Sequence, residues 1–348
     1  MRRGLRYAEV SRPGFRRLGR PGAWKYVDRQ GKNLRAAPSL GRIRALAIPP
    51  AWTEVWICPS ARGHIQATGR DARGRRQYRY HEAWRQAQEQ TKFHRTLAFG
   101  RVLPRIRATV ARDLRRPILD RRKVLAAVVR LLETTLVRVG NETYAKQNRS
   151  YGLTTLRRRH VRFKGGGAVE FHFRGKSGRF HRIDFDDPRL ARIIRRLEDL
   201  PGQHLFHFRA EDGRVLSVTA DHVNAYLREI AGEEFSAKDF RTWAGTVLAA
   251  LALGRVGQAD SQSESKRRLA EAVAQVAGQL GNTPAICRKS YIHPELIGGY
   301  LDGSTRAWLR RLGEKKARSA LRGLSAAEWA VMSYLGRHRR AVPAGAEA

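Results

Sequence analysis

The chain has 348 residues, which is long for one domain and suits two, and its hydrophobic fraction of 42% is enough to form a buried core. The 69 Lys and Arg residues exceed the 31 Asp and Glu residues by far more than solubility requires, and the net charge of +38 predicts a polyanionic partner, nucleic acid first of all. Only two cysteines are present, Cys58 and Cys287, and their wide separation argues against a disulfide framework and against a zinc site.

An anionic membrane surface is the alternative partner for so basic a chain. No apolar run reaches the roughly 18 residues that a membrane-spanning helix needs, and neither end carries a lipidation motif. Residues 1–20 are rich in Arg but lack the apolar segment of a secretory signal, so they form either a basic arm on DNA or a disordered segment. We therefore expect a cytoplasmic, nucleoid-associated protein that does not bind membranes.

Residues from about 22 to 86 alternate short apolar or aromatic runs with turn residues, which is typical of β-strands. Pro49 and Pro50 interrupt this region. The segment 81–91 is polar and helix-prone, and we place the domain boundary within it. The sequence thus predicts a small β-rich N-terminal domain over residues 1–86.

Helical patterns dominate the rest of the chain, because apolar residues recur at three- and four-residue steps. We expect one such helix to end at Gly140 and a later one at Gly254. A β-hairpin interrupts the helices, since the two alternating arms of AVEFHFRGKSGRFHRIDF flank the turn 175–178. The predicted fold class is α+β: the β-rich domain, a mostly α-helical domain over residues 87–340 that carries the hairpin, and a tail over 341–348.

Charge alone fits any nucleic-acid-binding protein, so a reaction must be sought in particular side chains. Phosphoryl transfer without a nucleotide requires a nucleophile, cationic donors to the phosphorane oxygens, and an acid for the leaving hydroxyl. The sequence has no Walker-type phosphate loop, no acidic cluster for paired magnesium ions and no His-Cys cluster for zinc. A covalent mechanism that needs neither metal nor cofactor is the remaining option.

Five blocks of sequence, in the same order, resemble the bacterial, poxvirus-like type IB DNA topoisomerases. The blocks are IPPAWTEVWICPSARGHIQATGRDARGRRQYRYH, VRVGNETYAKQNRSYGLTTLRRRHV, the GKSG turn, AKDFRTWAGT and LGNTPAICRKSYIHP. The resemblance runs from about Gly22 to Leu309, and the five blocks together are far more specific than any one of them. It implies the catalytic fold shared by tyrosine recombinases and type IB topoisomerases, and the relaxation of supercoiled double-stranded DNA by transient cleavage of one strand.

The same resemblance assigns roles to five residues, each at a position that matches the family's motif. Tyr291 would attack the scissile phosphate and form a 3′-phosphotyrosyl link. Arg138 and Arg241 would donate to the non-bridging oxygens. Asn282, where some members carry His, would donate to the same phosphate. Lys176, at the turn of the hairpin, would be the general acid for the leaving 5′-hydroxyl.

The chemistry of these side chains agrees with the roles. Arginine presents a planar fork of donors that suits a phosphate, whereas lysine delivers one proton from a flexible stem. Arg241 and Asn282 are both expected near helix N-termini, where backbone N–H groups favour an anion. Arg288 and Lys289, beside Tyr291, would lower the phenol pKa from its usual value of about 10. No residue is identifiable as the general base.

Each of these residues also has a simpler structural interpretation. Tyr291 could be a half-buried amphipathic side chain, and Arg138 a cation that favours the dipole of its own helix. Lys176 could be a solvated turn lysine, and Asn282 a turn or cap residue. The surrounding blocks, and not the single residues, favour the catalytic roles.

The segment RDARGRRQYRYH interleaves cations with polar and aromatic side chains, which suits contacts with phosphates and with a DNA groove. In the resembling poxvirus enzymes this segment reads bases in the major groove. Strand alternation places Tyr78 and Tyr80 on one face and Arg79 on the other, and a solvated edge strand with inward tyrosines is the alternative. The residues from which we expect DNA contacts are Arg73, Arg75, Arg76, Gln77, Tyr78, Tyr80 and, on the helical face of Arg241, Lys238.

The resemblance thus implies a DNA topoisomerase that works as a monomer clamping the duplex between its two domains. A tyrosine recombinase is the second hypothesis, because it uses a similar set of arginines, lysine and tyrosine. Recombinases usually carry a helical N-terminal domain, whereas this one is predicted to be β-rich. A non-enzymatic basic DNA-binding protein is the third hypothesis, and it would have no use for the combination of Lys176, Arg241 and Tyr291.

Overall fold

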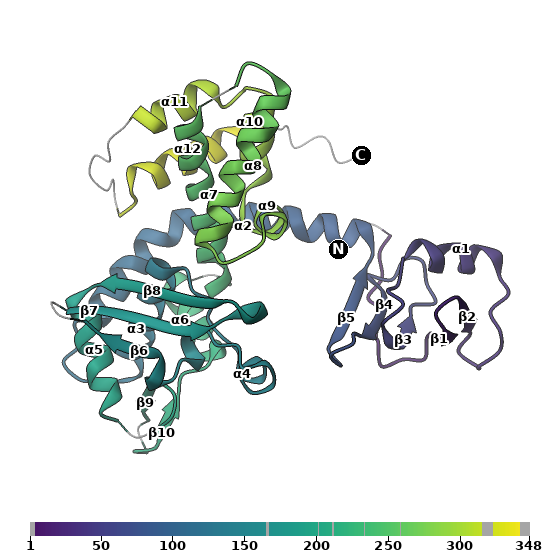
Figure 1. The fold of residues 1–348 in the computed structure, drawn as a ribbon, viewed down its shortest axis with the longest axis horizontal. Coiled ribbons are helices and arrows are strands. Elements are labelled where there is room, and N and C mark those ends of the chain that lie inside the picture. Colours follow the sequence, from purple (N-terminus) through teal and green to yellow (C-terminus); the bar gives the residue numbers. More distant parts are fainter. Residues whose placement is uncertain are drawn as a thin grey trace. The chain divides into compact units, whose positions relative to one another are not determined.

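The structure is a computed structural model that describes residues 4–164, 167–200, 202–210, 212–232, 234–257, 259–314 and 323–341. The chain divides into two compact units, one up to His94 and one from Arg95 onward (Figure 1). The division falls inside helix α2 (Glu82–Asp113), the helix in which the sequence analysis placed the domain boundary at residue 86. Each unit has a hydrophobic core of its own.

The first unit is an antiparallel five-stranded sheet in the order β2-β1-β3-β4-β5, with one short helix, α1 (Ala37–Ala45). Its strands are β1 (Phe15–Arg20), β2 (Ala23–Val27), β3 (Thr53–Ile57), β4 (Ile65–Arg70) and β5 (Arg76–Tyr80). A small core joins the helix to the sheet, and it consists of Ile43, Val55, Ile57 and Ala67. The β-rich N-terminal region expected from the sequence is present.

Strand β1 lies in the Arg-rich segment for which the sequence favoured a basic arm or disorder. Arg17 takes an inward-facing position that an apolar residue usually fills. Arg17 is 8% exposed, and its guanidinium donates to the carbonyl oxygens of Pro49 (3.1 Å) and Trp52 (2.5 Å) and stacks on Trp24 at 4.1 Å. Because this inward position holds an arginine, the strand lacks the alternating apolar pattern by which strands are predicted from sequence. Residues 1–3 of the expected arm lie outside the described residues.

The second unit is mostly helical, as expected, and carries two small antiparallel sheets with the orders β6-β7-β8 and β10-β9. After α2 its helices are α3 (Arg121–Thr135), α4 (Glu142–Asn148), α5 (Pro188–Glu198), α6 (Ala220–Ala231), α7 (Ala237–Val256), α8 (Gln262–Gln279), α9 (Pro284–Tyr291), α10 (Pro294–Leu301), α11 (Arg306–Glu314) and α12 (Ala326–Ala341). Short 3-10 helices are η1 (Leu153–Thr155), η2 (Arg158–His160) and η4 (Lys176–Gly178). The strands are β6 (Val161–Phe163), β7 (Ala168–Arg174), β8 (Phe180–Asp186), β9 (His207–Arg209) and β10 (Val215–Ser217).

The predicted hairpin is the pair β7 and β8, which run antiparallel with Arg174 opposite Phe180 next to the turn. Strand β6, which pairs with β7, and the ribbon of β9 and β10 add to it. These additional strands are three residues long, which is too short for an alternating pattern to stand out in the sequence. The predicted tail begins at the last residue of α12, and residues 342–348 lie outside the described residues.

Helix α7 is the centre of the helical packing, with α3, α6, α8, α9, α10, α11 and α12 against it. Its sequence AKDFRTWAGTVLAALALGRV is apolar nearly all round, and buried residues occur on every side of it. A helix with this pattern must be surrounded by other elements. Small side chains such as Ala249, Ala250 and Ala252 let those neighbours approach closely. Arg241, a charged residue on this helix, is therefore held in the interior of the unit.

Two predicted helix ends differ from the structure. Helix α3 ends at Thr135 and not at Gly140, because Leu136 adopts a left-handed conformation (φ 55°) and closes the helix. Helix α7 continues through Gly254 to Val256, and Gly257 (φ 66°) ends it. In each case the local pattern located the helix but not the residue at which the chain turns away. The first correction places Arg138 in a loop, so it is not a cation in the last turn of its own helix.

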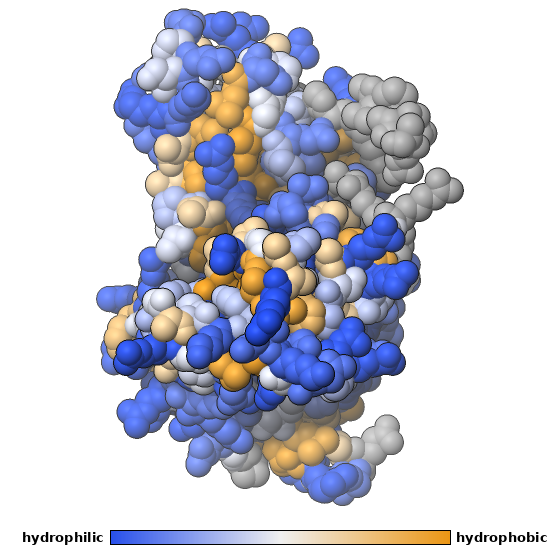
Figure 2. Space-filling model, turned by 90° about the vertical axis from the view of Figure 1, so that its right-hand side faces the viewer, coloured by the Kyte–Doolittle hydropathy of each residue, from blue (hydrophilic) through white to orange (hydrophobic). Residues whose placement is uncertain are grey.

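The surface is strongly polar, as the composition requires. The face shown in Figure 2 is mostly hydrophilic, with smaller hydrophobic patches between the charged side chains. Within the described ranges, no helix is both long and apolar enough to cross a lipid bilayer.

A buried carboxylate anchors helix α12 to the rest of the second unit. Glu328, which is 8% exposed, accepts hydrogen bonds from Arg107 (2.7 and 3.0 Å), from Nε1 of Trp243 (3.1 Å) and from the backbone N–H of Ser325 (2.8 Å). Burial raises the pKa of the Glu328 carboxyl, but these donors lower it more, so its net pKa lies below the usual value. The carboxylate is thus held charged between α2, α7 and α12.

We predict that Glu328→Ala lowers the free energy of unfolding by about 3 kcal/mol, because it leaves buried donors of Arg107 and Trp243 without their acceptor. Glu271→Ala, which removes an exposed partner of Arg267, should change it by less than about 0.5 kcal/mol. The difference between the two effects should shrink in acid. A carboxylate whose pKa is lowered in the folded state contributes its full stabilisation above its unfolded pKa of about 4.3, and this stabilisation is lost as the pH falls through the folded pKa. Urea unfolding followed by tryptophan fluorescence measures this, and equal effects of the two substitutions would contradict it.

Candidate active site

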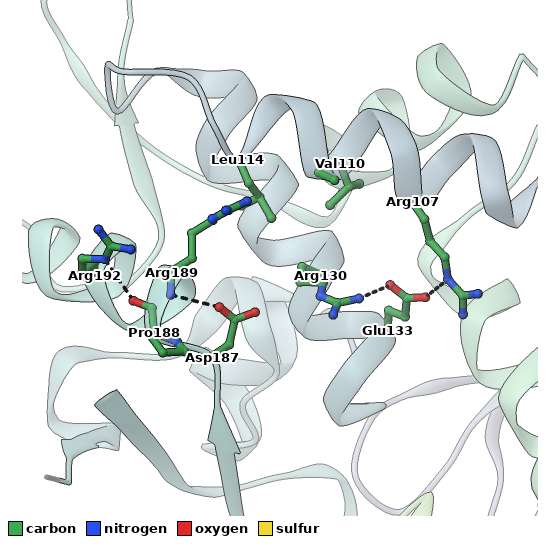
Figure 3. Close-up of a pocket in the computed structure, with 10 residues that line it drawn as sticks. Arg107, Val110, Leu114, Arg130, Glu133, Asp187, Pro188, Arg189 and Arg192 are labelled. Atoms are coloured by element: carbon green, nitrogen blue, oxygen red, sulfur yellow. Dashed lines mark hydrogen bonds and ion pairs between the residues drawn. The ribbon is translucent and has the colours of Figure 1, made fainter. Parts of the chain in front are cut away.

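Two of the pockets formed by the described residues lie in the second unit, and the larger of these two, with a volume of about 520 Å³, is the weaker candidate for chemistry. It lies between α2, α3 and α5, with Val110 and Leu114 on one wall (Figure 3). Two of its arginines share one carboxylate, since Glu133 accepts from Arg107 at 2.5 Å and from Arg130 at 3.1 Å. None of the residues lining this pocket is a nucleophile or one of the predicted catalytic residues.

The smaller pocket, of about 230 Å³, brings together segments that are far apart in the sequence. The loop after α3, the β7–β8 hairpin, helix α7 and the C-terminal end of α8 all contribute to it. Arg138, Lys176 and Arg241 line it, so three of the predicted catalytic cations surround one cavity. A cavity lined by cations from separate elements suits a phosphate group.

Arg241 lies in the early part of α7 and is almost fully buried, with 4% of its surface exposed. One terminal nitrogen donates to the carbonyl oxygen of Leu280 at 2.7 Å, and the other donates to that of Leu136. These acceptors are neutral, so they orient the guanidinium without cancelling its charge. The Nε–H is also buried and has no acceptor among the described residues.

Arg138 and Asn282 are bonded to each other. A terminal nitrogen of Arg138 donates to the side-chain oxygen of Asn282, with a longer contact of 3.4 Å to the carbonyl oxygen of Gly281. Because a guanidinium only donates, this bond fixes the orientation of the Asn282 amide. The amide nitrogen, Nδ2, is then left buried and without an acceptor among the described residues. Asn282 directly precedes Thr283, whose hydroxyl caps α9, so Asn282 lies near a helix N-terminus, as the sequence predicted.

Tyr291 is the last residue of α9 and is half-buried. The guanidinium carbon of Arg241 lies 5.1 Å from the centroid of its ring. Gly245, one helical turn after Arg241, leaves room for the backbone of Tyr291, because a Cβ there would lie 2.6 Å from the Tyr291 carbonyl oxygen. That carbonyl also accepts a hydrogen bond from Thr246 (3.3 Å). Helix α7 thus positions both the ring and the backbone of Tyr291.

The pKa of the Tyr291 phenol is set by opposing effects. Burial raises it, but the positive charges of Arg241 and Arg138 lower it more, so the net pKa lies below its ordinary value. Lys238, which is exposed on α7, contributes in the same direction. The sequence favoured Arg288 and Lys289 for this effect, but the main charges come from other elements that the fold brings to the ring.

Lys176 begins the short turn η4 between β7 and β8, and it is exposed at the edge of the pocket. The backbone N–H of Gly175 donates to the carbonyl oxygen of Arg179 at 2.7 Å and closes the turn. From the same turn, Arg179 donates to the backbone oxygen of Asn282 at 3.2 Å. The hairpin that carries Lys176 is therefore bonded to the loop that carries Asn282.

A further residue of this pocket escaped the sequence analysis. His181 on β8 lines the cavity beside Arg138 and Arg241 and is half-buried. A single histidine in a strand gives no local signal, since its neighbours in the pocket come from distant parts of the chain. Across the described residues, no group of three or more His, Cys, Asp or Glu side chains is arranged to hold a metal ion.

The residues predicted to contact DNA in the first unit lie on β5 and on the turn before it. Tyr78 and Tyr80 are 41% and 42% exposed and stack on each other with ring centroids 5.8 Å apart, so they do not pack inward. Asp71 holds the turn, accepting from the side chains of Arg75 and Gln77, each at 2.8 Å. The Arg75 bond lowers the pKa of the Asp71 carboxyl to about 2.

The other two residues of this group, Arg73 and Arg76, are both exposed. Exposed arginines next to a stacked tyrosine pair form a surface suited to phosphate and groove contacts. Arg79, on the opposite face of β5, instead donates to the carbonyl oxygen of Ala47 at 2.8 Å. The strand therefore has one face turned to solvent, as the alternation of its sequence predicted.

Comparison with known proteins is consistent with this geometry. Residues 81–304 match the family model described as "Eukaryotic DNA topoisomerase I, catalytic core", and residues 23–71 match "Bacterial DNA topoisomerase IB, N-terminal domain". The chain is also similar to DNA topoisomerase 1B of Acanthamoeba polyphaga mimivirus, with 35% identity over 258 residues that cover 72% of this chain and 76% of the relative. The catalytic-core match spans more than half of the chain and contains every residue of the pocket described above. The chain therefore belongs to the type IB DNA topoisomerases.

Proposed function

We propose that this protein relaxes supercoiled DNA by cleaving one strand through a 3′-phosphotyrosyl intermediate at Tyr291. One observation supports the proposal most. The buried donors Arg241 Nε and Asn282 Nδ2 have no acceptor among the described residues. Arg241 lines the cavity of about 230 Å³, and Asn282 is hydrogen-bonded to Arg138, which also lines it. A buried donor without an acceptor costs about 1–3 kcal/mol, and the oxygens of a bound phosphate would supply the acceptors.

The first step is attack by the phenol oxygen of Tyr291 on the scissile phosphorus. The bond from phosphorus to the phenol oxygen forms as the bond to the 5′-oxygen breaks, and the strand is left attached through its 3′-phosphate. The lowered pKa of Tyr291 supports this role, because it makes the phenolate easier to form.

Arg138, Arg241 and Asn282 would stabilise the charge that develops on the non-bridging oxygens. Arg138 and Arg241 are oriented by neutral oxygen atoms and keep their full charge for the substrate. Asn282 would add an uncharged donor, its free Nδ2–H. Donors that are fixed before the reaction need no reorganisation when the charge appears, which is why such groups are effective.

Lys176 would protonate the 5′-oxygen as it leaves. The side chain lies at the edge of the cavity and on a turn, so it can reach an atom outside the buried part of the site. In the reverse step the 5′-hydroxyl attacks the phosphotyrosyl phosphorus, returns its proton to Lys176 and releases Tyr291. The phosphodiester energy is kept in the covalent link, so the cycle needs no ATP and no metal ion.

The DNA would be held by the basic surface of both units. Arg73, Arg76 and the pair Tyr78 and Tyr80 form an exposed face in the first unit, and Lys238 adds a cation next to the pocket of the second. With a net charge of +38, we propose that the protein acts as a monomer that clamps the duplex and associates with the nucleoid.

We expect Tyr291→Phe to abolish relaxation, because only the attacking oxygen is lost. The measurement is relaxation of a negatively supercoiled plasmid in EDTA without ATP. Tyr144→Phe, which changes an exposed tyrosine away from the pocket, is the control and should relax DNA like the wild type. Relaxation by the Tyr291→Phe protein would move the nucleophile elsewhere, and inactivity of the wild type as well would favour a recombinase or a binding protein.

Lys176→Ala should slow single-turnover cleavage of ordinary DNA by about 10²- to 10⁴-fold, the usual contribution of a general acid. A substrate with sulfur in place of the 5′-bridging oxygen should be cleaved at nearly the wild-type rate, since a thiolate leaves without a proton. Lys146→Ala removes an exposed lysine of α4 and serves as the matched control. Equal losses on both substrates would remove Lys176 from the acid role.

Substitutions at Asn282 distinguish the role of its Nδ2–H donor from that of its side-chain oxygen, which accepts from Arg138. Asn282→Asp keeps an oxygen for Arg138 but removes the Nδ2–H, and we expect cleavage to slow by about 10²- to 10³-fold, as for other lost oxyanion donors. Asn282→His restores a donor and should retain more activity than Asn282→Asp. Single-turnover cleavage is measured, with DNA binding assayed in parallel, and a wild-type rate for Asn282→Asp would exclude the donor role.

A further inference from the structure

The ring of His181 contacts two separate parts of the proposed catalytic machinery. His181 lies opposite Phe173 in the β7–β8 register, and the two rings stack with centroids 5.2 Å apart and planes 19° apart. Phe173 is buried in the main core, so it fixes the His181 ring from the side of the sheet. The ring therefore has a defined position in the pocket.

The edge of this ring fits between two glycines. A Cβ on Gly175 would lie 2.5 Å from Cδ2 of His181, and a Cβ on Gly281 would lie 2.7 Å from its Cε1. The backbone of Gly175 (φ −97°) is one that other residues adopt, so the His181 ring, and not the backbone conformation, excludes a side chain there. The ring thus touches the main chain on both sides.

Each of these glycines directly precedes a proposed catalytic residue. Gly175 is followed by Lys176, and Gly281 is followed by Asn282. The hydrogen bond from Arg179 to the Asn282 carbonyl joins the same two segments, but it depends on one long, exposed side chain. The His181 ring also joins the two segments, and it is held in place by its stacking on Phe173.

The environment of His181 favours packing over charge. Burial and the positive charges of Arg138 and Arg241 lower the pKa of the imidazole below its ordinary value, so the ring is uncharged at neutral pH. Arg179 acts in the same direction. An uncharged ring can lie against two glycines among three cations, whereas a charged one would repel them.

We propose that His181 is a positioning residue whose ring spaces the Lys176 hairpin from the Gly281–Asn282 loop and so directs Lys176 at the leaving 5′-oxygen. The inference rests on the proposed function, because it acts through the general acid. A displacement of about 1 Å at a catalytic group can cost about 10² in rate. Loss of the ring would therefore affect the step in which a proton is delivered.

The test compares His181→Ala with His181→Phe on the ordinary substrate and on the substrate with 5′-bridging sulfur. His181→Ala should slow cleavage of ordinary DNA by about 10- to 100-fold and leave cleavage of the sulfur substrate near the wild-type rate. His181→Phe keeps the flat ring and its stacking on Phe173, and it should restore most of the rate. His172→Ala is the matched control, because it removes an exposed histidine of β7 that does not line the pocket.

Several results would overturn the proposal. Equal losses on both substrates would mean that His181 acts on the phosphate or on folding and not through Lys176. A His181→Phe protein as slow as His181→Ala would mean that the ring nitrogens are required, and a wild-type rate for His181→Ala would mean that the ring has no role. Lys176→Ala, assayed in parallel, distinguishes the acid role of Lys176 from the positioning role of His181. If the sulfur substrate restores the cleavage rate of Lys176→Ala but not that of His181→Ala, only the positioning role fails.

The contact itself can be tested by a double substitution. Gly175→Ala should slow cleavage of ordinary DNA, because its Cβ would displace the His181 ring. Adding His181→Ala should cause no further loss beyond that of His181→Ala alone, since the ring that the methyl group meets is gone. Losses that multiply in the double variant would show that position 175 and the ring act independently, and would contradict the proposed contact.

Discussion

The proposed active site depends on a guanidinium that is buried and oriented by neutral partners. Arg241 projects from the most enclosed helix of the second unit, and two main-chain carbonyls, those of Leu136 and Leu280, hold its terminal nitrogens. A carboxylate in their place would have fixed the side chain equally well, but it would have cancelled the charge. With carbonyl acceptors the positive charge remains available. The charge lowers the pKa of the Tyr291 phenol, and the Nε–H of Arg241 has no acceptor in the part of the chain that the structure describes.

The same two carbonyls belong to helix ends that are far apart in the sequence, so the site forms only when these parts of the second unit are packed together. Leu136 is the left-handed residue that ends α3, and Leu280 follows the last turn of α8, so Arg241 ties two helix ends to α7. Arg138 comes from the loop after the first of these ends, and Asn282 from the loop after the second. The bond between them closes the arrangement. The same hydrogen bonds therefore hold the helix ends together and fix the geometry of the proposed phosphate site.

The sequence predicted the parts of this site better than their connections. The β7–β8 hairpin has its own turn signal, and the blocks around Arg138, Arg241 and Tyr291 carried the resemblance to the family. Strand β1 was not predicted, because Arg17 fills an inward position through contacts with distant carbonyls. The role of His181 was not predictable either, since its two glycine neighbours lie on different segments and no local periodicity relates them. Local patterns locate elements, whereas packing between remote segments decides which side chains meet.

The length of helix α9 limits which insertions and deletions this chain can accept. The helix is eight residues long, with Asn282 just before its N-terminus and Tyr291 as its final residue, so it serves as a spacer of fixed length between a donor and the phenol. Inserting or deleting one residue in it would rotate the phenol by about 100° around the helix axis and shift it by about 1.5 Å. The interval between the two positions is thus constrained in length, and its composition is constrained where Cys287 packs into the core. Ala285 and Ile286 face solvent, so packing within the unit constrains these two side chains less than it constrains the number of residues in the helix.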